Sequence, residues 1–409
     1  MRRFSNGVGL VAFGAIALTA TEASAANPPC TSTGLAGTPV FIAGSSAAKP
    51  MLKQVSAALA AAANPVRLVY QSLGSCAGLS DMTTNTKEPA TGIVWDGTGT
   101  EMSCDAPNGG ATVDLAISDV FASSCTNITL GASQKDFQGS VQVFDFVVPP
   151  SSKETVISQQ AAFVVYGFGG QTNVVNPWAD TAFIFRRAAT SGTYSMTAKL
   201  LGLDIAKFKG TIPGAGKSGD VLTAVHAADT TSPDKALGVL SADYADTNRG
   251  GGSAIKVLAY QPKGAACGFY ADSSSTTFDK LNVRGGSYPF WGPLHFVTNV
   301  DGQGKPANAT VAQVLSYFTR DGLDVATKKK MIDAEVAGYT VPQCAMKVSR
   351  TAEVAPVDSA AAFSPAEPCG CYFESKATGA APKACTVCVD DNGCSGSTPK
   401  CRYGFCEAK

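Results

Sequence analysis

Short apolar runs alternate along this chain with segments in which apolar residues recur at helical spacing. The runs rich in β-branched, aromatic or small apolar residues predict strands at Pro39–Ala43, Val66–Tyr70, Val113–Ile117, Val141–Val148, Ala182–Phe185, Ala236–Leu240 and Tyr288–Val297. The helical spacing predicts helices at Ala47–Ala63, Ile157–Tyr166, Tyr194–Leu201, Gly219–Ala228 and Val311–Thr319. Strands that alternate with helices predict an α/β protein with mainly parallel strand pairing and sheets covered on both faces.

The first 25 residues have the pattern of a secretory signal peptide. Arg2 and Arg3 give a charged start, Val8–Leu18 is an apolar run too short to span a bilayer, and Ala23-Ser24-Ala25 is a small-residue cleavage site. We therefore expect cleavage after Ala25 and a periplasmic or secreted protein.

The 13 cysteines are concentrated at the C-terminal end. Seven of them follow residue 365: Cys369, Cys371, Cys385, Cys388, Cys394, Cys401 and Cys406. In an exported chain this density predicts a small disulfide-rich module at 369–409. A zinc site is the alternative, since Cys385 and Cys388 have ligand spacing, although the tail contains no histidine. Because the cysteine count is odd, at least one thiol is free or pairs outside the chain.

The rest of the composition narrows the functional classes. The body before the cysteine-rich module is longer than one core usually serves, which predicts two lobes, and residues 349–368, rich in Ala, Pro and Ser, have the composition of a linker. A formal net charge of zero argues against non-specific binding to nucleic acid. The two histidines lie far apart in the sequence, so we expect no catalytic residues, no metal and no cofactor.

Three segments share one design, in which a strand is followed by a loop of small residues and the start of a helix. They are Phe41–Pro50, Val69–Gly78 and the loop from Arg187 to Thr193. The first amides of a helix have no intrahelical partner and, with the helix dipole, favour an anion. Arg187 adds a bidentate donor for two oxygens of a tetrahedral oxyanion. In open parallel sheets such loops meet beyond the carboxyl ends of the strands, which predicts an anion site.

Asp119 follows the predicted strand Val113–Ile117 and would add negative charge to this site. An ionised carboxylate only accepts hydrogen bonds, so it can accept from a protonated phosphate but not from fully ionised sulfate. An unpaired buried charge costs several kcal/mol, enough for discrimination of about a thousandfold. The alternative is that Asp119 caps the next helix or is a solvated loop acid.

These motifs resemble, in the same order, those of the periplasmic phosphate-binding proteins of ABC-type phosphate uptake, the PstS-like family. Three segments carry the resemblance most clearly: Arg187-Ala-Ala-Thr-Ser191-Gly192-Thr193 matches that family's Arg-Ala-Asp-Gly-Ser-Gly-Thr loop, Tyr70-Gln-Ser-Leu-Gly-Ser75 its Tyr-Gln-Gly-Ile-Gly-Ser loop, and Ala116-Ile-Ser-Asp119 its Ala-Ser-Asp strand end. The segments Ala236–Ala245 and Tyr288–Leu294 resemble its later strands. The resemblance runs from about Val40 to Val297 and continues more loosely to about Val348.

The resemblance implies a two-lobed, type 2 periplasmic-binding-protein fold with hinge strands. The lobe boundaries it implies are 37–140 for the first part of lobe 1, 141–262 for lobe 2 and 263–348 for the return to lobe 1. Carried over by position, the residues around phosphate are Ser45, Ser46, Ala48, Lys49, Ser75, Asp119, Arg187, Ser191, Gly192 and Thr193.

The chain also departs from the family pattern. In the first loop, Ala47 or Ala48 stands where the family has a threonine, and Lys49 stands where it has an aromatic residue. Ala189 occupies the position of the acid that usually pairs with the arginine. Cys76 follows Ser75 directly and is a candidate for a disulfide, with Cys125 as one possible partner.

The function implied is that of a monomeric, non-enzymatic solute-binding protein. It would capture inorganic phosphate or a similar oxyanion between its lobes, for transport through an ABC permease or for sensing, with no nucleic acid as partner. The alternative is an envelope or structural protein that reuses the fold and attaches through its cysteine-rich tail. A phosphate-handling hydrolase has less support, since the sequence offers neither a metal-ligand cluster nor a nucleophile with its base.

Overall fold

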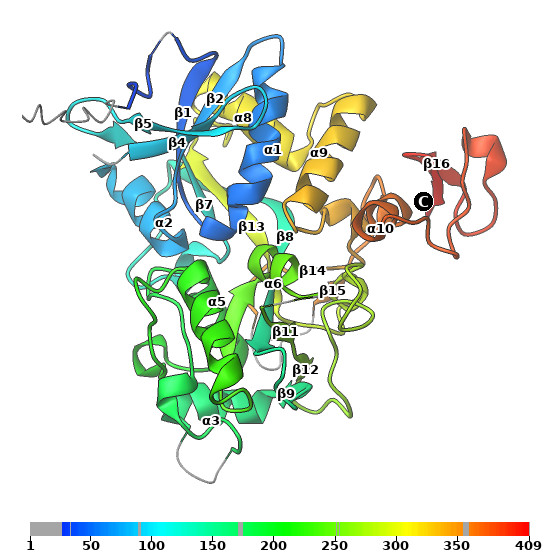
Figure 1. The fold of residues 1–409 in the computed structure, drawn as a ribbon. Coiled ribbons are helices and arrows are strands. Elements are labelled where there is room, and N and C mark those ends of the chain that lie inside the picture. The colour runs from blue at the N-terminus through cyan, green and yellow to red at the C-terminus, as the bar shows by residue number, and fades with distance from the viewer. Residues whose placement is uncertain are drawn as a thin grey trace, which may run out of the picture.

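The computed structural model describes residues 27–408 except 33, 89–90, 171–174, 251, 253 and 355–359. The expected signal peptide lies outside these residues. Figure 1 shows two lobes joined by long strands, with the C-terminal segment projecting to one side. None of the helices in the described part of the chain is both long and apolar enough to cross a membrane.

One mixed sheet runs through both lobes, in the order β10-β8-β13-β7-β1-β2-β4-β5, with β11 paired to β8. Its strands are β1 Thr38–Gly44, β2 Val66–Gln71, β4 Thr91–Trp95, β5 Glu101–Asp105, β7 Leu115–Ser118, β8 Gln134–Val148, β10 Gly238–Ser241, β11 Lys256–Val257 and β13 Trp291–Asn299. Only β1 is parallel to its neighbours, β2 and β7, and the other pairs in this sheet are antiparallel. The expectation of mainly parallel pairing was therefore wrong. Short connections, such as that between β4 and β5, allow antiparallel neighbours that need no crossover helix.

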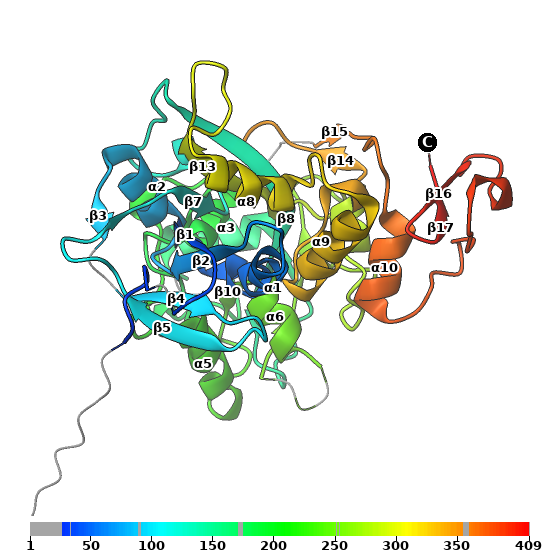
Figure 2. The same ribbon diagram turned by 90° about the horizontal axis from the view of Figure 1, so that it is seen from above.

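Helices and short paired strands cover this sheet and complete the lobes (Figures 1 and 2). The helices are α1 Lys49–Ala60, α2 Ser75–Thr84, α3 Gln159–Phe168, α4 Gly192–Leu201, α5 Ser218–Ala227, α6 Ala242–Asn248, α7 Leu281–Gly285, α8 Ala309–Thr319, α9 Val325–Ala337 and α10 Gly370–Thr378. The short strands are β3 Lys87–Glu88, β6 Ala111–Thr112, β9 Val156–Ser158, β12 Ala259–Gln261, β14 Val348–Ser349, β15 Ala361–Ala362, β16 Lys400–Arg402 and β17 Phe405–Glu407. The 3₁₀ turns near the site and the lobe contact are η1 Ser46–Ala48, η2 Ala122–Ser124 and η3 Thr181–Phe183.

The long strands β8 and β13 pair with each other and connect the two lobes. Towards lobe 1, β13 pairs with β7, and Phe296 of β13 stacks on Phe318 of α8 with ring centroids 4.4 Å apart. Towards lobe 2, β8 pairs with β10 and β11. The two strands are buried along most of their length, so the connection between the lobes is itself part of the hydrophobic core.

The predicted strand at Ala182–Phe185 was wrong. The segment forms the turn η3 instead, because the Asp180 side chain accepts from the Ala182 amide and caps a 3₁₀ turn. Only Ile184 and Phe185 are extended, each in a single parallel bridge, with Leu237 and Thr211 respectively. These two bridges lead the chain directly to Arg187.

The C-terminal module is held by disulfides, as expected. Its bonds are Cys371–Cys385, Cys388–Cys401 and Cys394–Cys406, and Cys344–Cys369 ties its start to the body. The Sγ atoms of Cys388, Cys394 and Cys406 lie within 4.8 Å of one another because two disulfides meet there. Sulfurs that are bonded to each other are not thiolate ligands, so the zinc alternative does not fit this arrangement.

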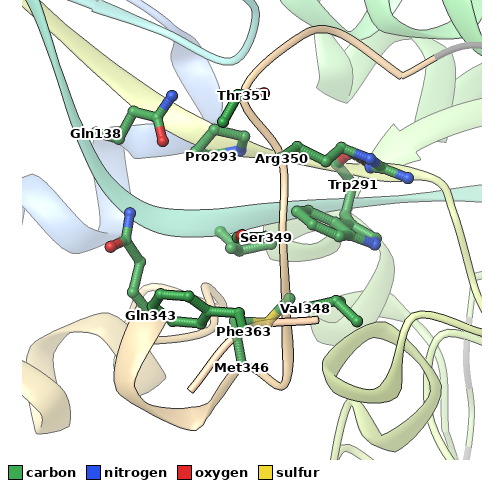
Figure 3. A pocket seen from close by; sticks show the side chains of 11 residues that line it. Gln138, Trp291, Pro293, Gln343, Met346, Val348, Ser349, Arg350, Thr351 and Phe363 are labelled. Carbon is green, nitrogen blue, oxygen red and sulfur yellow. Dashed lines mark hydrogen bonds between the residues drawn. The ribbon is translucent and has the colours of Figure 1, made fainter. Parts of the chain in front are cut away.

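The segment with linker composition packs against the hinge strands in its described parts. Val354 is buried, and the Glu353 carboxylate accepts from the Phe121 amide at 3.1 Å and from the Ser124 hydroxyl at 2.9 Å. Beneath the segment lies a cavity of about 180 Å³. Figure 3 shows Trp291 and Arg350 stacked on one side of it and Gln138 and Gln343 on the other. This cavity lies on the hinge strands, and none of the residues that line it is among those predicted to bind an anion.

Candidate functional site

The lobe-1 half of the site is built at the carboxyl ends of β1, β2 and β7. The Ser45 hydroxyl donates to the Asp119 carboxylate, and the Asp119 amide donates to the Ser75 hydroxyl at 3.1 Å. Gly44 has a φ of 137°, and a Cβ at this position would collide with the Ile117 carbonyl. Glycine therefore allows β1 and β7 to approach closely enough for Ser45 and Asp119 to meet.

The lobe-2 half of the site is centred on Arg187, which is only 6% exposed. Its Nε donates to the Gly216 carbonyl at 2.9 Å, and its Nη1 donates to the hydroxyls of Ser218 and of Thr193, the latter at 3.5 Å. Its Nη2 reaches across to lobe 1 and donates to the Ser46 hydroxyl at 3.3 Å. The guanidinium thus bridges the lobes through neutral oxygen atoms.

The two halves are in direct contact. The Cys76 amide, at the start of α2, donates to the Thr190 carbonyl at 3.2 Å. A Cβ on Gly192 would lie 2.6 Å from Oδ2 of Asp119 and would collide with the Ser75 hydroxyl. Only glycine fits there, so the N-terminus of α4 abuts the Asp119 side chain of lobe 1.

Burial governs the electrostatics of the site. Desolvation raises the pKa of Asp119, and the Ser45 hydroxyl and Arg187 partly offset this rise. Desolvation lowers the pKa of Arg187, and the nearby Asp119 and Asp243 oppose that shift. No carboxylate within ion-pair distance of Arg187 is found among the described residues. This agrees with Ala189 standing where a partner acid was expected.

Eight of the predicted site residues gather at the lobe contact: Ser45, Ser46, Ala48, Ser75, Asp119, Arg187, Gly192 and Thr193. Ala48 is fully buried and has no polar side chain to offer. Ser191 caps α4 through its position, but its side chain makes no capping hydrogen bond. The side chain of Lys49 is directed elsewhere, because its Nζ pairs with the Glu101 carboxylate at 2.9 Å on the outside of lobe 1.

Three further residues of the site were not found by sequence reasoning. Ser218 begins α5 and contacts Arg187 directly. Ser241 and Asp243 lie where β10 passes into α6, and Asp243 is 5% exposed and acts electrostatically on Arg187 and Asp119. For Ser218 a signal was present in Gly214-Ala215-Gly216-Lys217-Ser218, a glycine loop that opens a helix. The acid in Ser241-Ala242-Asp243 gave no comparable signal.

A disulfide strengthens the rim of the site. Cys76 is bonded to Cys125, as the sequence allowed, and this joins the first turn of α2 to the residue that follows η2. A second disulfide, Cys30–Cys104, holds the N-terminal segment to β5. The thirteenth cysteine, Cys267, is exposed and free.

No protein-family model matches this sequence, and no curated protein matches it significantly. Among solved structures, the fold is similar to a putative phosphate ABC transporter substrate-binding protein with bound phosphate from Clostridium perfringens, with 13% identity, 75% of this chain and 99% of that chain covered, and a TM-score of 0.49. It is also similar to an ABC-type phosphate transport receptor from Vibrio cholerae, with 14% identity, 75% and 100% coverage and a TM-score of 0.47. The OxyR regulatory domain from Pseudomonas aeruginosa is similar over 68% of this chain and 96% of its own, with 11% identity and a TM-score of 0.37. At such identities the likeness concerns the fold alone. In fold, this chain is similar to the substrate-binding proteins of phosphate ABC transporters, the family that its sequence motifs resemble.

Proposed function

We propose that this protein reversibly captures inorganic phosphate, or an oxyanion of the same shape and protonation, between its two lobes. The observation that carries the proposal is the state of Arg187. This guanidinium is buried where the lobes meet, and its described contacts are three hydroxyls and one carbonyl. Asp119 and Asp243 act on this cation from a distance, but no carboxylate pairs with it directly, so its guanidinium can form a charge-assisted bidentate pair with an anion.

The groups around Arg187 favour a tetrahedral oxyanion. Hydroxyls come from both lobes, from Ser45, Ser46 and Ser75 on one side and from Thr193 and Ser218 on the other. The N-termini of α2, α4 and α5 add amides and partial positive charge. Donors on several sides of one point suit an ion with four oxygens better than a planar carboxylate.

Asp119 supports a ligand that carries a proton. The Asp119 carboxylate is 2% exposed and accepts a hydrogen bond from the Ser45 hydroxyl. An anion beside this carboxylate is repelled unless it donates a hydrogen bond to it. Monohydrogen phosphate has a hydroxyl to donate, and sulfate at neutral pH has none. The predicted selectivity is for phosphate over sulfate, by about a thousandfold if an unpaired buried charge costs several kcal/mol.

Binding of the anion between the lobes would change the conformation of the protein. Because Arg187 and the α4 amides belong to lobe 2 while Asp119 and Ser75 belong to lobe 1, a bound anion stabilises the closed form over an open one. The closed form is then available to a membrane partner, and an ABC permease is the partner we propose. The six disulfides support a protein that works in an oxidising compartment after export.

The proposed mechanism is binding without covalent chemistry. In the described part of the chain, both histidines have partners other than the serines of the site. His226 Nδ1 lies 3.1 Å from the Ala254 carbonyl oxygen, and His295 Nδ1, on the strand next to Asp119, lies 2.7 Å from an Asp136 carboxylate oxygen. Neither is placed to activate a site serine as a nucleophile.

Isothermal titration calorimetry of protein stripped of phosphate tests the proposal. We expect one phosphate per chain, and for sulfate either no heat or binding weaker by at least about a hundredfold. Absence of binding by both ions would contradict the proposed function. Sulfate bound as tightly as phosphate would leave an anion site but remove the role given to Asp119.

A further inference from the structure

A second buried acid, Asp243, lies beside the proposed anion site. It sits in the first turn of α6, directly after β10, and the Ser241 hydroxyl donates to its carboxylate. Helix α6 packs against η1, the turn that carries Ser46, whose hydroxyl accepts from Arg187. Asp243 therefore approaches the site from lobe 2, on a different element from Asp119.

The charged groups that act on Asp243 are those of the site. They are Asp119 and Arg187, with the phenols of Tyr70 on β2 and Tyr244 on α6 itself. The Tyr70 hydroxyl donates to the Ser45 carbonyl at 2.6 Å, which places this ring beside the Ser45–Asp119 pair.

Charged groups on the other elements packed against α6 have partners of their own. Asp220 of α5 accepts from the Ala215 and Lys217 amides, His226 at the end of α5 bonds to the Ala254 carbonyl, and Lys256 of β11 donates to the Ser152 carbonyl. Asp145 of β8 and Asp246 of α6 belong to a separate cluster with Arg249 and Lys280. Arg187 is thus the cation that acts on both Asp119 and Asp243, and the His295 ring, whose backbone pairs with Ser118, acts in the same direction on Asp119.

The charges of Asp119, Asp243 and Arg187 do not neutralise a doubly charged anion. Two ionised carboxylates and one guanidinium sum to −1, and monohydrogen phosphate would add −2 in a buried space. Coulomb repulsion at low effective dielectric is then relieved by adding protons. Burial already raises the pKa of Asp243 to about 7, so this group takes up a proton easily near neutral pH.

We propose, resting on the proposed function, that Asp243 is a second proton-sharing carboxyl of the anion site and that phosphate binds together with one proton from solvent. The balance is monohydrogen phosphate plus one proton plus ionised Asp243, giving a complex in which the added proton lies between the Asp243 carboxyl and a phosphate oxygen. The same bonding describes dihydrogen phosphate bound to an ionised Asp243. The site therefore selects a diprotonated tetrahedral oxyanion, and Asp243 is a specificity-determining residue.

Proton uptake measured by calorimetry tests this inference. Phosphate is titrated at pH 8 in two buffers of different ionisation enthalpy, and the slope of observed enthalpy against buffer enthalpy gives the protons taken up. For the unaltered protein we expect uptake of about one proton per phosphate, because a carboxyl with a pKa near 7 is mostly ionised at pH 8 before binding. Asp243→Asn should lower the uptake by about one proton and flatten the decline of phosphate affinity above pH 7.

Two further variants and one control measurement separate the outcomes. Asp243→Asn keeps an acceptor for the Ser241 hydroxyl, and its near-ultraviolet circular dichroism reports whether the site remains folded. Asp119→Asn should retain the uptake that belongs to Asp243, and Asp204→Asn, an exposed acid on another surface, should match the unaltered protein. Phosphate binding without proton uptake, or uptake that Asp243→Asn leaves unchanged, would overturn the inference while the proposed function stands. A complete lack of phosphate binding by the unaltered protein at pH 6 and pH 8 would instead contradict the proposed function.

Discussion

Two groups of buried charges contact α6, and they are neutralised in different ways. In the first, Arg249 and Lys280 pair with Asp246 and Asp272 at 2.5–3.0 Å, and Asp145 lies beside them. In the second, Arg187 meets only hydroxyls and a carbonyl, and Asp119 and Asp243 accept from serine hydroxyls.

The first cluster has the properties of a structural element. Each cation has two carboxylates, and further donors fill the remaining positions, such as the Lys280 amide to Asp272 at 2.7 Å. The second group leaves its cation without a carboxylate, and its surroundings come from both lobes. The comparison teaches that burial alone does not identify a binding site. Arg67 makes the same point for a lone buried cation, since it is 5% exposed and donates only to backbone carbonyls in lobe 1. What sets Arg187 apart is its position where the two lobes meet, with hydroxyls from both lobes around it.

Breaking the first cluster should have the largest effect on stability. Asp272→Ala removes a carboxylate shared by Arg249 and Lys280 and leaves buried positive charge, so we expect the free energy of unfolding in urea to fall by about 3–5 kcal/mol. Asp204→Asn is the control and should change it by less than about 0.5 kcal/mol. A loss below about 1 kcal/mol for Asp272→Ala would mean that the two cations find other partners.

Removing Arg187, the cation of the second group, should affect phosphate binding more than stability. Arg187→Met should weaken phosphate binding by at least about a hundredfold, nearly 3 kcal/mol, because a charge-assisted bidentate pair is lost. Its free energy of unfolding without ligand should change by less than that of Asp272→Ala, since Arg187 makes no direct ion pair and loses hydrogen bonds to neutral groups only. Arg187→Lys retains the charge without the fork and should bind with intermediate affinity. Destabilisation by several kcal/mol together with unchanged affinity would assign Arg187 to the structural class.

The acids of the second group should also make stability depend on pH. The folded-state pKa of Asp243, about 7, lies above its ordinary value of 3.8, so the folded protein binds this proton more tightly than the unfolded chain. Its contribution is fully present below pH 4 and is lost as pH rises to 7. Asp243→Asn removes that loss, and we expect the variant to gain about 1–3 kcal/mol relative to the unaltered protein between pH 4 and pH 8. Parallel unfolding curves at the two pH values for both proteins would show that Asp243 does not titrate in this range.

The smallest effect is expected at Lys49. Its ammonium and Glu101 form a partly exposed pair, and such pairs contribute about 0–1 kcal/mol. Lys49→Ala should therefore change unfolding by less than about 1 kcal/mol and leave phosphate affinity within about twofold. A tenfold loss of affinity would return Lys49 to the site, where the sequence resemblance put it.

The sequence indicated those parts of the site in which local motifs carry the geometry. Helix starts after strands are visible in the chain, so Ser45, Ser75, Asp119 and Arg187 could be named, and the structure brings them together. The rotation of a side chain about its helix is not visible. Lys49 lies only one residue after η1, yet its side chain points outward to Glu101.

Contacts between distant segments were beyond prediction. Asp243 follows a strand as Asp119 does, but its approach to Arg187 depends on how α6 packs against η1, which no local pattern encodes. Strand direction was misjudged for a similar reason. Apolar runs are typical of any strand buried on both faces, so they did not distinguish the antiparallel β8 and β13 from parallel strands. At Asp180 a single side-chain bond outweighed the β-propensity of Ala182–Phe185.

The disulfide pattern has a practical consequence for site-specific fluorescent labelling of this protein. Twelve cysteines are joined in pairs, which leaves the exposed thiol of Cys267 as the single position where a maleimide dye can react. The native chain can therefore be labelled at one known point without deleting any cysteine. The tryptophans, including Trp95 in lobe 1 and Trp291 on the hinge, offer intrinsic donors for energy transfer to that dye. The lobe closure that we propose can therefore be followed optically without an engineered cysteine.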